Sequence, residues 1–237
     1  EIKEEAKDKY LDAKARGDYI EAKKYSQMTS SLKADMIRSS KELLEAMGIP
    51  YLDSPSEGEA QAAYLALKGE ADLSASQDYD SILFGAPTLV RNLTITGKRK
   101  VPGKDLFVDV VPEIISSNNI YNTLQISREQ LIQIAILIGT DYNPGGIKGI
   151  GPKKAIDIIK SGKFSKYGNF DQLIDLFLKP NITDKYNISF KKPVKDKIIR
   201  LLCDKYDFSE LRVEKGIERM EFALENTLKQ NTLDKYF

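Results

Sequence analysis

The pattern of hydrophobic and polar positions changes near residue 125 of this chain. Before that point, short apolar runs alternate with longer stretches in which apolar residues recur every three or four positions. This alternation of strands and helices predicts an α/β fold with a mixed, largely parallel sheet flanked by helices. Beyond residue 125 the helical period dominates, so a mainly helical region is expected there.

The first 47 residues predict helices of two kinds. Up to about Met28 the sequence is highly charged and lacks a convincing apolar face, which indicates an exposed, mobile helical segment. A stripe of apolar positions then runs from Leu32 to Met47 and ends at Gly48, a residue suited to a helix terminus. Only this later helix is expected to pack against a core.

The remaining elements follow at short intervals, separated by glycine, proline and serine. In the α/β region we expect strands at 49–52, 71–77, 88–95 and 104–110, a helix at 54–69, a loop with a short helix at 77–85, and a basic turn at 96–104. In the helical region, a capping box formed by Ser127 and Gln130 starts a very apolar helix, and three or four further helices reach Leu228.

The segment SPSEGEA, residues 54–60, has two interpretations. Ser54 as N-cap, Pro55 in the first turn and Glu57 three residues after the cap form a capping box pattern. Taken alone, the stretch favours this capping role over catalysis. The alternative is that Glu57 and Glu59 form half of a metal site, because capping does not require Glu59.

Asp78 and Asp80 form the DYD motif after the apolar run ADLSASQ. Ligand sites of open α/β sheets lie at the carboxyl ends of such strands. If the strand continues, the two carboxylates point the same way and suit a hard divalent cation such as Mg²⁺. An acidic loop that caps the following helix explains the motif equally well.

Asp141 ends the apolar helix QLIQIAILIGTD. A carboxylate at the negative end of a helix is electrostatically unfavourable, so a metal ion or a nearby lysine is expected to compensate it. A simple turn before Asn143 and Pro144 is the alternative.

The stretch IKGIGPKKAIDII, residues 147–159, predicts a helix-hairpin-helix. Gly149 and Gly151 bracket a tight hairpin, Pro152 opens the next helix, and Lys153 and Lys154 lie in its first turn. Backbone N–H groups at such a helix start can hold a phosphate with help from the lysines, without reading the sequence of a nucleic acid. A plain turn between two helices is the alternative, although two lysines in a first turn oppose the helix dipole unless an anion is present.

The composition excludes several kinds of chemistry. The chain has no histidine, so a Ser-His-Asp triad, a Cys-His pair, histidine-ligated zinc and a histidine base are ruled out. The one cysteine, Cys203, allows neither a disulfide framework nor a zinc cluster and is expected to be a core thiol. Catalysis must therefore use carboxylates, lysines, tyrosines or hard metal ions. With 36 basic and 35 acidic residues, the net charge of +1 does not indicate a nucleic-acid partner by itself.

Length and hydropathy favour a globular intracellular protein. The 237 residues, 41% of them hydrophobic, can bury the core of one larger or two smaller domains. No apolar run reaches the roughly 18 residues that span a bilayer, and the charged start EIKEEAKDK is not a signal peptide.

The last eight residues, QNTLDKYF, have the spacing of a docking peptide. Gln230, Leu233, Tyr236 and Phe237 define this spacing. As one helical turn it projects Leu233 and both aromatic rings to one side, which fits a hydrophobic pocket of a partner protein. Packing back onto the same domain is the alternative.

The motifs SPSEGEA, SQDYDSILFG, GTDYN, GIGPKKA and QNTLDKYF together resemble those of the flap endonuclease branch of the structure-specific 5′ nuclease family. They keep the family's order and approximate spacing over nearly the whole chain, and the last one resembles the box that binds the sliding clamp, PCNA. The resemblance implies a 5′ nuclease or PIN-like fold. Its expected parts are part of a helical arch at 1–32, the nuclease core at 33–125, a helical DNA-binding region at 126–228 and the clamp-binding tail at 229–237.

The resemblance also implies a site for two Mg²⁺ ions, with Mn²⁺ as a substitute. Glu57, Glu59, Asp78, Asp80 and Asp141 match the family's acidic positions. On a regular helix Glu57 and Glu59 project about 200° apart, so we expect Glu59 to bind one ion directly and Glu57 to act through water. Asp78 and Asp80 are expected to hold the second ion, and Asp141 to act from the outer side.

Other family features are matched less completely. Three features of the family have no counterpart here: two further acidic ligands, the first sheet strand and the basic gateway residues. The chain is therefore expected to begin within the helical arch and to belong to a longer protein. The arch cations that could contact a threaded single strand are Lys7, Lys9, Lys14, Arg16, Lys23 and Lys24. The stretch DFSELRVEKGIERM resembles the region that holds a 3′ flap nucleotide, with Phe208, Ser209 and Arg212 as candidate contacts.

The function implied is Mg²⁺-dependent cleavage of 5′ flaps in branched DNA, with 5′ exonuclease activity, during replication and repair. Expected partners are branched DNA and the sliding clamp, with K⁺ between the carbonyls of the helix-hairpin-helix and a DNA phosphate; a monomer without a membrane partner is expected. A related 5′ exonuclease or junction nuclease is one alternative, and a non-catalytic, clamp-tethered DNA-binding module is another.

Overall fold

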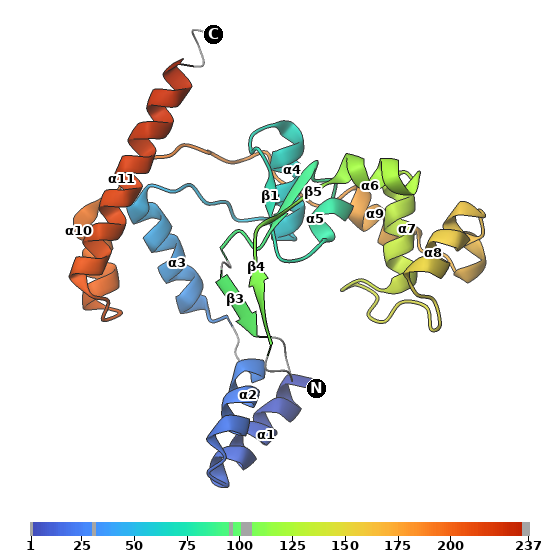
Figure 1. Ribbon diagram of the computed structural model, residues 1–237, viewed down its shortest axis with the longest axis horizontal. Helices are drawn as coiled ribbons and strands as arrows, with labels where there is room; N and C mark the ends of the chain where they lie inside the picture. Colours follow the sequence, from blue (N-terminus) through green and yellow to red (C-terminus); the bar gives the residue numbers. More distant parts are fainter. Residues whose placement is uncertain (1, 30–31, 95–96, 101–105, 234–237) are drawn as a thin grey trace. The chain divides into compact units, whose positions relative to one another are not determined.

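The computed structural model describes residues 2–29, 32–94, 97–100 and 106–233. The chain divides into two compact units, and Figure 1 shows their elements along the chain. Unit 1 consists of Glu1–Tyr51 and Ile188–Phe237, whereas unit 2 is the continuous stretch Leu52–Asn187. All five carboxylates of the expected metal site belong to unit 2.

Unit 2 contains a three-stranded sheet with the order β1-β2-β5. Strand β1 (Ser74–Ala75) runs parallel to β2 (Thr88–Arg91), and β2 runs antiparallel to β5 (Glu113–Ser116). Helix α4 (Gly58–Lys68) packs against β1 and against the short helix α5 (Asp80–Leu83). The predicted mixed α/β class is confirmed. Among the described strands one pairing is parallel and two are antiparallel, the strand predicted at 49–52 does not form, and β5 was not expected from the sequence.

A separate two-stranded ribbon corrects the sequence-based expectation for residues 97–100. Strand β3 (Gly97–Lys100) pairs antiparallel with β4 (Phe107–Val110), so that Lys98 lies opposite Asp109. The stretch GKRK was predicted to belong to a basic turn. Its backbone instead completes a hydrogen-bonded ladder with β4, an outcome that depends on the partner strand more than on local preference.

Helices make up the rest of unit 2. They are α6 (Ser117–Leu124), α7 (Arg128–Ile138), α8 (Pro152–Lys160), the 3₁₀ helix η1 (Phe164–Tyr167) and α9 (Asp171–Leu178). The predicted capping box of α7 is confirmed, because Gln130 N donates to Ser127 Oγ at 3.1 Å and Ser127 N donates to Gln130 Oε1 at 2.9 Å.

Helix α7 lies between the two hydrophobic clusters of this unit. Its residues Ile132 and Ile136 join one cluster with Ala60 of α4, Leu83 of α5 and Phe177 of α9. The opposite face of α7 packs against α8 in the second cluster, whose members are Ile126, Ile134, Leu137, Ile150, Ala155, Ile158 and Ile159. The apolar helix predicted from the sequence is therefore the central support of the unit.

Unit 1 includes a helical hairpin and a small core. Helices α1 (Ile2–Ala15) and α2 (Tyr19–Thr29) pack together through small buried residues, Ala6, Ala13 and Ala22 (Figure 1). The exposed fraction of the Ile20 side chain is 87%, in keeping with the expected lack of a broad apolar face.

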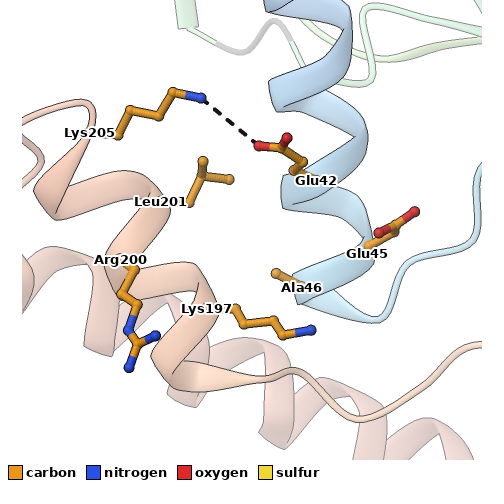
Figure 2. Close-up of a pocket in the computed structure, with 7 residues that line it drawn as sticks. All are labelled: Glu42, Glu45, Ala46, Lys197, Arg200, Leu201 and Lys205. Carbon is orange, nitrogen blue, oxygen red and sulfur yellow. Dashed lines mark ion pairs between the residues drawn. The ribbon is translucent and has the colours of Figure 1, made fainter.

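The small core of unit 1 joins α3 (Ala34–Met47) to α10 (Lys195–Ile199), to the π-helical segment η2 (Arg200–Asp204) and to α11 (Glu210–Leu233). Figure 2 shows the groove beside this core, where Lys205 of the turn after η2 reaches toward Glu42 of α3, with 3.9 Å between Nζ and Oε2. Cys203 is a partly buried thiol packed against the same core. Within the described ranges, no helix is both long and apolar enough to cross a membrane.

The segment 179–194 connects α9 to α10 without regular secondary structure. On the unit 2 side, the buried Gln61 side chain donates to Thr183 O at 3.0 Å and accepts from Thr183 N at 2.8 Å. On the unit 1 side, Lys191 N donates to Gly48 O at 2.9 Å and Val194 N to Ala46 O at 2.7 Å. The first part of the segment is thus hydrogen-bonded to unit 2 and its last part to unit 1.

Candidate active site

The start of α4 differs from the capping box predicted at SPSEGEA. The helix begins at Gly58 with Glu57 as its N-cap, and Ser54 lies outside it. The Ser54 hydroxyl instead donates to the Glu57 carbonyl at 2.9 Å, which closes a turn before the helix. Serine side chains that bond to nearby backbone groups compete with capping in this way. The Glu57 side chain makes no capping hydrogen bond and is directed to another partner.

That partner is Tyr142, which the sequence motifs did not single out. Its hydroxyl donates to Glu57 Oε1 at 2.8 Å. Burial, followed by the hydrogen bond to Glu57, raises the pKa of Tyr142 to about 12. The phenol therefore remains protonated at neutral pH and can donate to the carboxylate.

Glu59 lies in the first turn of α4 and contacts the end of β1. The Ser76 hydroxyl, directly after the strand, is hydrogen-bonded to Glu59 Oε1. The same hydroxyl accepts from Asp78 N at 3.1 Å. Ser76 thus links a carboxylate of α4 to the turn that carries Asp78, a role for which the sequence contains no spacing signal.

The DYD turn places Asp78 and Asp80 in different surroundings. The argument that both carboxylates point the same way required the strand to continue through them. Strand β1 ends at Ala75, so this condition is not met. Asp78 lies in the turn, whereas Asp80 is the first residue of α5. The predicted loop leading into a short helix is confirmed. The capping role considered for the two carboxylates is not observed, because the N-cap of α5 is Tyr79 and no side chain makes a capping hydrogen bond there.

Arg91 supports this turn from the neighbouring strand β2. Its guanidinium lies 4.2 Å from the ring centroid of Tyr79, and its Nε donates to Gln77 O at 2.9 Å. An ion pair of 3.1 Å to Glu113 of β5 holds the guanidinium from the other side. The parallel pairing of β1 and β2 brings Arg91 next to the DYD turn, so its role could not be inferred from either segment alone.

Asp141 lies beyond α7, which ends at Ile138, and not at the helix end as predicted. It occupies a turn in which Thr140 Oγ1 donates to Asn143 Oδ1 at 2.6 Å and Asn143 Nδ2 donates to Ile136 O at 2.7 Å. Because the turn carries Asp141 away from the last helical residues, the expected conflict with the helix dipole is reduced.

The five carboxylates influence one another through space. Burial raises the pKa of Glu59, with the charges of Asp80, Asp78 and Glu57 as further causes, and the Ser76 hydrogen bond opposes the rise. The pKa of Asp80 is raised by burial and then by Asp141, Asp78 and Glu57. All the charged groups behind these two shifts are anionic, and carboxylate oxygens are the donors that Mg²⁺ prefers. The donor set therefore fits divalent cations.

The carboxylates are near one another without forming a closed cage. Across the part of the chain that the structure describes, no group of three or more histidine, cysteine or acidic side chains converges closely enough to hold a metal ion. Asp78, Asp80 and Asp141 line a cavity of about 510 Å³ whose walls include the apolar residues Leu83 and Ile134. We refer to the five carboxylates as the acidic edge of unit 2, and three of them line this cavity with its partly apolar walls.

The helix-hairpin-helix elements form as predicted between α7 and α8. Gly149 has φ +80°, a conformation that favours glycine, and Gly151 is the N-cap of α8 with Pro152 in the first turn. Lys154 Nζ lies 3.3 Å from Gly149 O and donates to it. This contact gives one of the two first-turn lysines a partner inside the hairpin.

The remaining candidate contacts lie in unit 1. Phe208 is 57% exposed and, with Arg212, lines a mostly apolar cavity of about 390 Å³; Ser209 directly precedes α11. Gln230 and Leu233 belong to the last turns of α11, whereas Tyr236 and Phe237 lie outside the described residues. Their expected roles stay predictions.

Comparison with known proteins identifies the class. Residues 48–141 match the XPG I-region family. Among solved structures, the catalytic core of Rad2 in complex with DNA substrate shares the fold, with a TM-score of 0.63 and 22% identity over 81% of this chain and 70% of that one. The structure therefore has the 5′ nuclease fold.

The closer relatives define the family. The flap endonuclease 1 of Pyrococcus abyssi is 52% identical over 244 aligned residues, which cover 100% of this chain and 71% of the relative. The flap endonuclease 1 of Pyrococcus furiosus is 50% identical, with 72% of its length covered. The flap endonuclease-1 structure from Methanococcus jannaschii has a TM-score of 0.74 and 42% identity over 89% of this chain and 65% of that chain. The chain belongs to the flap endonuclease family.

Proposed function

We propose that the protein is a structure-specific endonuclease that hydrolyses a phosphodiester near the base of a 5′ flap in branched DNA, and that it also has 5′ exonuclease activity. The observation that carries this proposal is that the charges of Glu57, Asp78 and Asp141 act on the partly buried carboxylates Glu59 and Asp80, in a chain of the flap endonuclease family. Replication and repair are the processes that produce and consume such DNA.

Divalent cations, Mg²⁺ or Mn²⁺, are proposed to bind at Glu57, Glu59, Asp78, Asp80 and Asp141. Two such ions would supply Lewis acidity for the attack of water on the phosphodiester and for the departure of the leaving oxygen. The pKa values of Glu59 and Asp80 support this, because burial raises them and the charges of the neighbouring carboxylates raise them further.

The residues around the cluster prepare it for this task. Ser76 holds Glu59 against the DYD turn, and Arg91 holds the turn through Tyr79 and Gln77. The polyanionic edge repels a DNA phosphate by itself, so binding of the scissile phosphate is proposed to depend on the cations.

DNA outside the cluster is proposed to bind at three places. Gly149, Gly151, Lys153 and Lys154 would hold the duplex backbone at the start of α8, where N–H groups favour a phosphate, with K⁺ among the hairpin carbonyls. Phe208, Ser209 and Arg212 would contact a 3′ flap nucleotide, and the cations of the α1–α2 hairpin would contact the flap strand. A sliding clamp would bind the tail through Gln230, Leu233, Tyr236 and Phe237.

The proposal is tested with purified full-length protein, an end-labelled 5′-flap DNA and Mg²⁺. We expect incision near the flap base and, for Asp80→Ala, loss of cleavage with DNA binding near the wild-type level. DNA binding without incision would exclude the nuclease and favour a clamp-tethered binding module. Faster incision of a four-way junction than of a flap would favour a junction nuclease.

A further inference from the structure

Tyr142 links two elements of unit 2 at the edge that carries the carboxylates. Its hydroxyl reaches Glu57 Oε1 at 2.8 Å, across 85 positions of sequence. Glu57 is the N-cap of α4, whereas Tyr142 follows Asp141 in the turn after α7. The bond commits Oε1 to the tyrosine and thereby fixes the direction in which the other carboxylate oxygen points.

The ring of Tyr142 is held by the core. It meets the ring of Phe177 edge to face, with centroids 5.7 Å apart and an interplanar angle of 86°. Phe177 is fully buried, and its ring also lies 5.0 Å from that of Phe84. In addition, Arg128 Nη2 donates to Phe177 O at 2.8 Å and Arg128 Nε to Leu83 O at 3.0 Å, which fixes α9 next to α5. The tyrosine ring therefore rests on a rigid support.

The backbone of the turn is held as well. Tyr142 N donates to Thr140 Oγ1 at 3.3 Å, and Asn143 joins Thr140 to Ile136 of α7. The same turn carries Asp141, whose charge acts on Asp80. This short, hydrogen-bonded turn thus carries the Asp141 carboxylate itself and binds the Glu57 carboxylate through the Tyr142 hydroxyl.

We propose that Tyr142 is a positioning residue that orients the Glu57 carboxylate toward the divalent cations. Glu57 lies at an exposed helix start, where its side chain would otherwise populate several rotamers. A donor on a rigid support selects one of them, and partners of this kind tune the affinity of metal ligands in proteins. The inference rests on the proposed function, since it requires that Glu57 contribute to cation binding.

The test compares Tyr142→Phe with Tyr64→Phe. The first variant keeps the ring and its contact with Phe177 but removes the hydroxyl. The second is a matched control, because Tyr64 of α4 donates to the Asp184 carboxylate at 2.9 Å, a bond of the same chemistry away from the site. Three quantities are measured in the full-length protein: Mn²⁺ binding without DNA by electron paramagnetic resonance, the Mg²⁺ dependence of flap cleavage, and the melting temperature.

We expect Tyr142→Phe to weaken Mn²⁺ binding about tenfold and to raise the Mg²⁺ concentration at half-maximal rate by a similar factor. The KM for DNA and the melting temperature should stay close to the wild-type values. Tyr64→Phe should bind Mn²⁺ as the wild type does. In a Glu57→Gln background, Tyr142→Phe should have little further effect, because the two residues act as a unit.

The outcomes separate this inference from the proposed function. If the wild type binds Mn²⁺ and cuts flaps while Tyr142→Phe behaves identically, the positioning role is refuted and the nuclease proposal stands. If the wild type neither binds Mn²⁺ nor cuts, both are refuted. Equal losses of Mn²⁺ affinity and melting temperature in both tyrosine variants would overturn the positioning role in favour of a general effect on stability.

Discussion

Two clasps attach the segment after α9 to helix α4, and their relative strength can be predicted. The first is the amide pair between the Gln61 side chain and the Thr183 backbone, with Gln61 only 3% exposed. The second joins Lys68 to Asp184 at 2.8 Å, with side-chain exposures of 39% and 61%, and Tyr64 shares the same carboxylate. We predict that the neutral buried clasp contributes more to stability than the charged exposed one.

The perturbation is Gln61→Leu, which keeps the approximate volume of the side chain and removes both hydrogen bonds. A typical intramolecular hydrogen bond contributes about 1 kcal/mol net, so the pair should contribute about 2 kcal/mol to the free energy of unfolding. The matched variant is Lys68→Met, which removes the ion pair and keeps a long aliphatic side chain. The Lys68–Asp184 pair raises the pKa of Lys68, but both groups are solvent-exposed, where screening leaves ion pairs weak.

The assay is urea denaturation followed by circular dichroism. With a slope of about 2 kcal/mol per molar urea, Gln61→Leu should lower the midpoint by about 1 M, and Lys68→Met should shift it less. Hydrogen exchange of the Thr183 amide should speed up in Gln61→Leu and stay near the wild-type rate in Lys68→Met. A midpoint shift for Lys68→Met as large as that for Gln61→Leu would refute the reasoning, since the charged clasp would then be the stronger one.

Three further predictions concern the helix start, the acidic edge and the tail. Ser127→Ala removes the capping box of α7 and should lower the free energy of unfolding by about 1 kcal/mol in urea denaturation; an unchanged midpoint would contradict this. Asp80 has a pKa raised above 3.8, mainly by burial, so its contribution to stability is complete below that pH and is lost as the pH rises through the folded-state value. Asp80→Asn should therefore melt at a higher temperature than the wild type at pH 7 in chelator, with the difference vanishing in acid; a lower melting temperature at pH 7 would refute the sign. Phe237→Ala should lose stimulation of flap cleavage by the sliding clamp, measured as the ratio of rates with and without clamp, and an unchanged ratio would count against the tail as its binding site.

Local signals in the sequence predicted the elements whose stabilising contacts are also local. The capping box of α7, the glycine ends of α3 and α4 and the hairpin before α8 each depend on residues within a few positions of one another, and they were predicted correctly. The capping prediction at SPSEGEA was wrong, because the Ser54 hydroxyl donates to the Glu57 carbonyl and accepts from Ser56 N at 3.4 Å instead of bonding to the N–H groups of α4.

The organisation of the candidate site could be predicted only in part. The carboxylates were recognised through family motifs, because periodicity alone left a capping or loop role open for each of them. Tyr142, Ser76 and Arg91 were missed, since each acts on a residue of another element, and Tyr142 is 85 positions from Glu57. Long-range partners of this kind leave no spacing pattern in a single sequence.

The division of unit 1 into two stretches has a consequence for synthesis of the protein. A ribosome completes Leu52–Asn187, with every proposed carboxylate ligand, before it makes the first residue of α10. The contacts described within unit 2 need nothing that is synthesised later, whereas Ala46 of α3 waits for Ile198, Val213 and Ile217 before its core can close. All five proposed carboxylates are therefore synthesised while unit 1 is still half made, and α3 waits for its partners in α10 and α11.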